Sequence, residues 1–377
     1  MKTTQKSYRA SQLLLAGISG ILFNVCLTSI PAQAQVVRAK AWVLANQPNT
    51  PLNTPYTPDL NYQYNSTNAT NQATRLGVGE YRVNFPNLGT AGGTVHVSSY
   101  GGNHHCKVVS WGSSGTTQQV RVNCFTPNGV PVNGRFTVLF YKESRRSTTW
   151  TDAYLWANQP TTPSYTPSNT YQWNSKRTIN TASRFDTGII RYQATLTSLN
   201  VVGGTVLVTA YGSGSERCKA VNWFPSGGNT LVNVNCFNSS GNLVDTRYNL
   251  SYMTDVAIGI DVSENTDYGG YVWANNPTAG FYTPDPTYQL NNTGGTNTIT
   301  RNSLGKYTVR FPNLKPSNRT TAQVTAYGSA SEYCTVNFWN SDGSGGTNVN
   351  VQCFNSLGNL VDTRFTLTYL TNQQILF

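Results

Sequence analysis

Short runs in which apolar and polar side chains alternate recur along the chain and predict β-strands. Residues 81–85, 232–236 and 307–311 follow this pattern, and clusters of Gly, Asn, Ser and Pro separate one run from the next. A period of two places the apolar side chains of a strand on one face, where they can form a core. No segment sustains the period of an amphipathic helix, so the pattern predicts an all-β chain.

The predicted strands belong to a unit of about 110 residues that occurs three times. Each copy opens with Ala-Asn-Gln-Pro or Ala-Asn-Asn-Pro, passes through Tyr-Thr-Pro and two cysteines, and closes on Arg followed by an aromatic residue. The strand pattern predicts three tandem antiparallel β-sandwich domains, Ig-like or jelly-roll-like. These span residues 36–143, 150–255 and 268–373, and we expect each domain to fold on its own.

The first 34 residues have the pattern of a secretory signal peptide. Lys2, Lys6 and Arg9 precede an apolar stretch that is too short to span a membrane, and small residues end the segment at Ala34. No later segment is apolar enough to span a bilayer. After cleavage near Ala34, we expect a protein that is secreted, periplasmic or held at the cell surface.

The six cysteines that follow this segment predict one disulfide in each repeat. A cluster of turn-forming residues lies at the centre of each cysteine pair. The pairs are Cys106–Cys124, Cys218–Cys236 and Cys334–Cys353. Two residues equidistant from the tip of a hairpin face each other across the strands, within reach of a disulfide. Secreted proteins also commonly use an even number of cysteines in this way.

A tryptophan and a tyrosine recur at equivalent positions and are the candidate ligand-binding residues. Each tryptophan lies five residues after the first cysteine of its repeat, and each tyrosine lies in the strand before that cysteine. They are Trp111, Trp223, Trp339, Tyr100, Tyr211 and Tyr327. In an unbroken strand, the odd spacing places the tryptophan opposite the disulfide, on a polar face. Aromatic rings on such a face can stack on sugars or anchor protein interfaces.

The same tryptophans have a second interpretation, in which they are buried. A single β-bulge between the cysteine and the tryptophan would turn the indole inward, onto the disulfide. Tryptophan packed near a disulfide is common in β-sandwiches. The sequence therefore leaves two hypotheses, an exposed aromatic platform and a buried structural residue.

Charge and catalytic chemistry are sparse. Charged residues make up 11% of the chain, and loss of the signal segment lowers the formal net charge from +11 to +8. The basic residues form no stripe that could follow a phosphate backbone, so we expect no nucleic-acid partner. His104 and His105 precede Cys106, but the other repeats carry no histidine there, so we expect no metal and no cofactor. No nucleophile–base or acid–base pattern recurs, and we expect no enzymatic activity.

Two recurring charged positions have structural interpretations. An arginine occurs at Arg75, Arg184 and Arg301, and we expect it to bind turn carbonyls. An aspartate occurs at Asp245 and Asp362, where the first repeat has Asn133. Each aspartate lies two residues before an arginine of its own strand, which suggests a weak surface pair.

The repeat as a whole resembles a known group of sequences. The landmarks YVWANNPT, YTP, GKYTVRFPNL, VTAYGS, VNVQCFN and DTRFTLTY are similar to those of uncharacterised secreted bacterial β-domain proteins with three repeats. The resemblance covers all three repeats and implies no activity or site. The closing Arg-Phe-Thr strand is also similar to the last strand of trimeric jelly-roll domains.

Three functions fit these features. The leading hypothesis is a secreted, non-enzymatic protein that binds a glycan or a cell-envelope component through several weak sites, whose combined strength comes from linkage. The second is a purely structural extracellular or surface-layer protein. The third is a hydrolase whose site is assembled from scattered residues. Buried aromatic residues would favour the structural role, and paired carboxylates in a deep pocket would favour the hydrolase.

Overall fold

The computed structural model describes residues 39–143, 151–258, 260, 267–316 and 319–372. The predicted signal peptide and its cleavage position at Ala34 lie outside these residues. The described residues belong to one compact unit. Within the described ranges, no helix is both long and apolar enough to cross a membrane.

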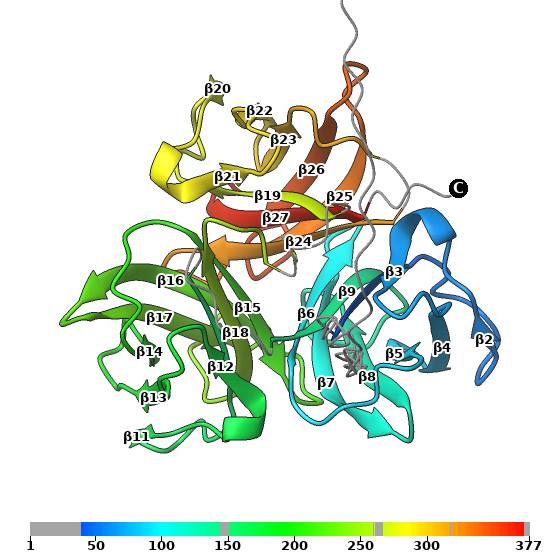
Figure 1. Ribbon diagram of the computed structural model, residues 1–377, viewed down its shortest axis with the longest axis horizontal. Helices are drawn as coiled ribbons and strands as arrows, with labels where there is room; N and C mark the ends of the chain where they lie inside the picture. The colour runs from blue at the N-terminus through cyan, green and yellow to red at the C-terminus, as the bar shows by residue number, and fades with distance from the viewer. Residues whose placement is uncertain (1–38, 144–150, 259, 261–266, 317–318, 373–377) are drawn as a thin grey trace, which may run out of the picture. The chain divides into compact units, whose positions relative to one another are not determined.

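Strands dominate the structure and occur in the same order in each repeat, as Figure 1 shows. The first repeat contains β1 (Ala39–Ala45), β2 (Pro55–Tyr56), the short 3₁₀-helix η1 (Leu60–Tyr62), β3 (Gln63–Asn65), β4 (Gln72–Gly77), β5 (Glu80–Phe85), β6 (Thr94–Tyr100), β7 (His105–Ser114), β8 (Thr117–Phe125) and β9 (Arg135–Lys142). The second contains β10 (Thr151–Ala157), β11 (Ser164–Tyr165), η2 (Asn169–Tyr171), β12 (Gln172–Asn174), β13 (Thr181–Arg184), β14 (Tyr192–Leu196), β15 (Thr205–Tyr211), β16 (Arg217–Ser226), β17 (Asn229–Phe237) and β18 (Arg247–Thr254). The third contains β19 (Asp267–Ala274), β20 (Phe281–Tyr282), η3 (Pro286–Tyr288), β21 (Gln289–Asn291), β22 (Thr298–Ser303), β23 (Lys306–Phe311), β24 (Thr320–Tyr327), β25 (Tyr333–Ser341), β26 (Thr347–Phe354) and β27 (Arg364–Asn372).

Each repeat is a sandwich of two antiparallel sheets. In the first repeat, an inner sheet of order β3-β1-β9-β6 packs against an outer sheet of order β2-β4-β5-β8-β7. Buried and partly exposed residues alternate along the outer strand β5, as the sequence predicts. Val83, Val122 and Val138 belong to the core between the two sheets. The other two repeats copy this plan, which confirms the predicted fold class.

The three disulfides join the predicted cysteine pairs. In each hairpin the two cysteines are directly opposed, with their Cα atoms 4.0 Å apart. The third pair is separated by 19 residues rather than 18, and the longer turn between Ser341 and Thr347 accommodates the difference. In the chain-entropy account, closing a loop of this length contributes about 3 kcal/mol to stability.

Strand pairing also joins the repeats to one another, at three junctions that we call seams. At each seam a parallel bridge forms: β7 with β15, β16 with β24, and β25 with β6. Each of the three resulting nine-stranded sheets combines the outer sheet of one repeat with the inner sheet of another. A glycine N–H donates to a carbonyl across each seam, at 2.8–2.9 Å. Because the third repeat pairs with the first, the series of seams is closed.

The inner sheets are buried on both faces. Trp42, Leu139, Leu207 and Leu370 lie in one apolar cluster that draws on all three repeats. A strand that is covered on both faces loses the alternation of apolar and polar residues. This explains the continuous apolar run Ala41–Ala45 of β1, in which every residue is buried.

Polar side chains at the contact between the inner sheets are hydrogen-bonded across the repeats. His96 lies between Thr209 and Ser251, with ring nitrogens 3.1 and 2.6 Å from the two hydroxyl oxygens. Lys40 of the first repeat and Asp267 of the third form an ion pair in which both side chains are fully buried. These contacts satisfy polar groups that burial would otherwise leave unpaired.

Candidate functional site

The recurring tryptophans are buried, so the prediction of an exposed polar face for Trp111, Trp223 and Trp339 is wrong. Their exposed fractions are only 9%, 6% and 6%. Each hairpin shifts register between the cysteine and the tryptophan, at Val108/Ser110, Ala220/Asn222 and Val336/Phe338. The extra residue of each bulge inverts the side-chain alternation and turns the indole inward. The buried alternative is therefore confirmed.

Each tryptophan packs against aromatic residues of a different repeat. Trp111 contacts Trp156, Tyr171 and Tyr211 of the second repeat, with ring centres 5.4–5.6 Å apart and edge-to-face geometry. Such pairs add about 0.5–1.5 kcal/mol each beyond the area that they bury. The indole of Trp111 therefore stabilises the seam and has no free face for a sugar ring.

The second seam repeats this cluster and the third modifies it. Trp223 contacts three rings of the third repeat at 5.6–5.7 Å. These rings are Trp273, Tyr288 and Tyr327. Trp339 contacts Tyr62 and Tyr100 of the first repeat at 5.5 and 5.3 Å. Each recurring tyrosine thus contacts a recurring tryptophan of another repeat, and not the tryptophan of its own repeat, with which it was expected to share a face.

Glycine carbonyls receive two of the indole N–H groups. Trp111 donates to Gly92 at 3.1 Å and Trp223 donates to Gly203 at 2.7 Å. Gly203 has a φ of +94°, and a Cβ at this position would overlap the carbonyl oxygen of Thr287 in the third repeat. The seam therefore requires glycine here, both for its backbone conformation and for the close approach of the two backbone segments.

The tyrosines are only partly buried, and arginines cover two of them. The guanidinium carbons of Arg135 and Arg247 lie 5.2 and 5.3 Å from the ring centres of Tyr100 and Tyr211. Burial raises the pKa of Tyr211. Each arginine thus adds a cation–π contact to the tyrosine of its seam, at two of the three seams.

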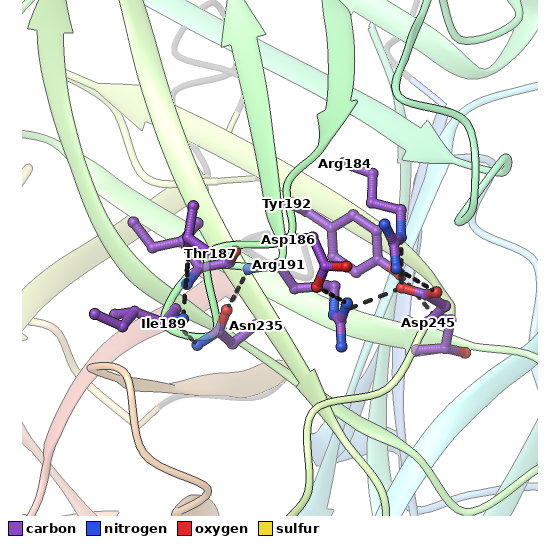
Figure 2. Close-up of polar contacts among 10 residues, drawn as sticks. Arg184, Asp186, Thr187, Ile189, Arg191, Tyr192, Asn235 and Asp245 are labelled. Carbon is purple, nitrogen blue, oxygen red and sulfur yellow. Dashed lines mark hydrogen bonds and ion pairs between the residues drawn. The ribbon is translucent and has the colours of Figure 1, made fainter.

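The recurring arginines and aspartates bind each other, which corrects the expectation that each aspartate would pair with the arginine two residues after it. Arg75 also donates to the carbonyl of Thr50 at 3.3 Å, a contact of the kind expected for these arginines. Figure 2 shows Arg184 donating two hydrogen bonds of 3.0 Å to Asp245, which also accepts a 3.2 Å hydrogen bond from Tyr192. Arg301 and Asp362 form the same bidentate pair at 2.9 and 2.8 Å. In the first repeat the amide oxygen of Asn133 accepts from Arg75 at 3.3 Å.

These pairs fit a structural role better than a catalytic one. The hydrogen bond from Arg301 holds the pKa of Asp362 below its ordinary value, which makes the carboxylate a weak base. A general base performs best when its pKa lies near the working pH. Asp245 lies within 3.6 Å of Arg191 as well, so its charge is already neutralised by two arginines.

A pocket that the sequence did not predict lies where the three repeats meet. Its lining includes the residue before the first cysteine of every repeat, together with parts of the inner strands β6, β15 and β24. The empty space measures about 560 Å³, including its mouth. We call it the central pocket.

Two ion pairs between repeats line the central pocket. Lys107 lies 2.6 Å from Glu216, and Lys219 lies 3.0 Å from Glu332. Burial lowers the pKa of both lysines, against the opposing effect of their carboxylate partners. At the third seam Thr335 takes the place of the lysine, and its hydroxyl donates to the carbonyl of Gly102 at 3.1 Å.

The residue before the first cysteine differs in each repeat, although its surroundings recur. His105, Arg217 and Tyr333 occupy this position and all line the central pocket. The sequence signal for the site was this divergence at one position of an otherwise regular repeat. In the part of the chain that the structure describes, no group of three His, Cys, Asp or Glu side chains could hold a metal ion.

Comparison of the chain with protein-family models, with curated proteins and with solved structures found no match.

Proposed function

We propose that this chain is a secreted, non-enzymatic structural protein of the cell surface or extracellular space. One observation carries the proposal: all three recurring tryptophans lie in seams between repeats. Large aromatic side chains that bind ligands need an accessible face, whereas these indoles are used to join the repeats.

The covalent and topological features support the same role. Each hairpin next to a seam carries a disulfide, and at each seam the end of an inner edge strand pairs with the hairpin of another repeat. Disulfides persist in the oxidising environment outside the cytoplasm. A protein with these features resists unfolding and edge-to-edge aggregation where no chaperone can repair it.

A glycan or cell-envelope ligand is the second candidate function, and it now requires a different surface. Phe224 and Phe338 neighbour Trp223 and Trp339 in sequence and are 38% and 43% exposed. The bulges that bury the tryptophans leave these two rings on the outer face of their hairpins. An exposed phenylalanine beside polar side chains can stack on a sugar ring.

A paired experiment separates the two functions. The mature chain is applied to a glycan array and to isolated cell envelopes, alongside Trp223→Ala and the double variant Phe224→Ala/Phe338→Ala. The structural role predicts that no glycan is selected and that Trp223→Ala changes only the melting temperature. The binding role predicts that the mature chain is retained on glycans or cell envelopes. It also predicts that the double phenylalanine variant loses this retention while its melting temperature stays unchanged.

A further inference from the structure

Three equivalent side chains, one from each repeat, approach one another in the central pocket. The guanidinium carbon of Arg217 lies 4.5 Å from the ring centre of Tyr333, and the ring centre of His105 lies 5.8 Å from that of Tyr333. All three residues are at least nine-tenths buried. The pocket thus contains a cation, a phenol and an imidazole that have little access to solvent.

Arg217 has a buried charge without an ionic partner. Among the residues that the structure describes, no carboxylate lies within 4.0 Å of its guanidinium group. Its Nε and Nη1 atoms have no hydrogen-bond partner, and Nη2 donates only a long 3.4 Å bond to the carbonyl of Asn238. A buried and uncompensated charge is strongly destabilising, and a guanidinium group cannot lose its proton to avoid the cost.

The pocket itself cannot supply the missing anion. Glu216 and Glu332 are held by Lys107 and Lys219, so the lining has three cations and two carboxylates. Tyr333 is not a counter-ion, because burial raises its pKa to about 12. Its hydroxyl donates to the carbonyl of Asn103. A bound anion would supply the compensating charge.

His105 adds a requirement on the chemistry of that species. Its Nε2 lies 2.9 Å from the carbonyl oxygen of Ser215, which can only accept, so Nε2 carries the proton. Burial, together with nearby Arg217, lowers the pKa of His105 to about 3, and the ring is neutral at physiological pH. Nδ1 is then an acceptor, and it is buried without a partner. It can be satisfied by a hydroxyl group.

We propose that the central pocket binds a small oxyanion that carries a hydroxyl group, with Arg217 pairing the negative charge and His105 accepting a hydrogen bond from the hydroxyl. Hydrogenphosphate and small hydroxycarboxylates share this chemistry. The side chains of Glu216 and Glu332 are 30% and 24% exposed, so they lie towards the mouth, where the two lysines neutralise them. An anion can therefore enter without strong repulsion.

The test is calorimetric titration of the oxidised mature chain in a buffer without phosphate at pH 7. Four ligands are compared: phosphate, sulfate, lactate and acetate. Sulfate and acetate match the charged groups of the other two but lack the hydroxyl hydrogen. We expect phosphate to bind at least tenfold more tightly than sulfate, or lactate at least tenfold more tightly than acetate. Whichever of phosphate and lactate binds more tightly shows whether the pocket takes a phosphate or a hydroxycarboxylate.

Two variants test whether Arg217 binds the anion. Arg217→Gln is expected to weaken binding at least tenfold. Arg247→Gln, which also removes a guanidinium group that lies over a tyrosine ring, should leave it unchanged. Thermal melts check the fold of both variants, and Arg217→Met, which likewise removes the charge, replaces Arg217→Gln if the latter does not fold. The proposal is overturned if none of the four ligands binds, if sulfate equals phosphate and acetate equals lactate, or if Arg217 variants bind normally.

Discussion

Leu44 of the first repeat lies in the same core cluster as Trp339 of the third, at the position where the other two seams have Trp156 and Trp273. The seam that closes the series therefore has one indole rather than two. It also lacks a lysine–glutamate pair, since Thr335 replaces the lysine. Both differences remove contacts from the seam between the first and last repeats.

We expect this closing seam to open first. The amide of Gly101 crosses it, whereas the amides of Gly212 and Gly328 cross the other two, all with hydrogen bonds of 2.8–2.9 Å. Regions with fewer buried contacts open at lower free energy. Native-state hydrogen exchange should show Gly101 exchanging fastest of the three. Equal protection at the three glycines would contradict the prediction.

Trp223→Ala should lower the free energy of unfolding by about 3–5 kcal/mol, because it removes a buried indole and three ring contacts. Denaturant unfolding measures the loss. Phe224→Ala is the matched control, since Phe224 is the next residue along the strand and is 38% exposed. The control should change stability by about 0.5 kcal/mol or less. A similarly small loss of stability in both variants would contradict the burial of Trp223.

Gly203→Ala should destabilise the second seam through overlap with Thr287. Gly227 offers a control for the backbone, because it also has a positive φ of +56° but a Cβ there meets open space. The Gly203 variant should lose about 1–3 kcal/mol more than Gly227→Ala, which is the usual range for overpacking. Urea melts of both variants give the difference. Equal losses of stability in the two variants would mean that the positive φ alone, and not the contact with Thr287, requires glycine at position 203.

His96 should make the protein less stable in acid. Burial lowers its pKa to about 3 from an ordinary value of 6.5. Between these two values the unfolded chain binds a proton that the folded chain does not, so stability falls as the pH decreases through this window, by about 1.4 kcal/mol per pH unit. The third repeat has Gln323 at the equivalent position. His96→Gln should reduce the slope of the unfolding free energy against pH by that amount between pH 6 and 4, as measured by denaturant unfolding at each pH. An unchanged slope would show that His96 is not the group responsible.

The second repeat alone, residues 151–254 carrying Arg217→Tyr to match Tyr333, should associate into trimers, because the substitution avoids placing three buried guanidinium groups in one pocket. As a monomer it would expose Trp223, the second face of its inner sheet and the unpaired edges of β15 and β16. In three identical copies, β16 of one copy can pair with β15 of the next, as β16 pairs with β24 in the full chain. Analytical ultracentrifugation over a range of concentrations tests this. A stable monomer with cooperative unfolding would instead support independent domains, as the repeat pattern alone suggests.

The disulfides could be predicted from sequence because their geometry is local. Each cysteine pair brackets its own turn, so distance along the chain decides which residues face each other. The prediction of the tryptophans' orientation was wrong for a local reason as well. One extra residue, such as Val109, reverses the alternation, and no residue type in this position marks a bulge.

The seams and the central pocket depend on contacts far apart in sequence. The continuous apolar run Ala41–Ala45 in β1 signals a strand covered on both faces, but it does not say what covers it. Arg301 and Asp362 recur with their repeat, yet 61 residues separate them, and only the fold shows that they are partners. Likewise, the divergence of His105, Arg217 and Tyr333 is visible in the sequence, while their approach is not.

Joining the three repeats in one polypeptide has an evolutionary consequence. In an assembly of three identical chains, any residue at the contact between all three must occur three times, so a charge placed there would face two copies of itself. A single gene removes that restriction. His96, Leu207 and Gln323 share one equivalent position, and Lys40 can pair with Asp267 because its counterparts are free to differ. Mutation can then give each copy its own chemistry while the other two preserve the shape.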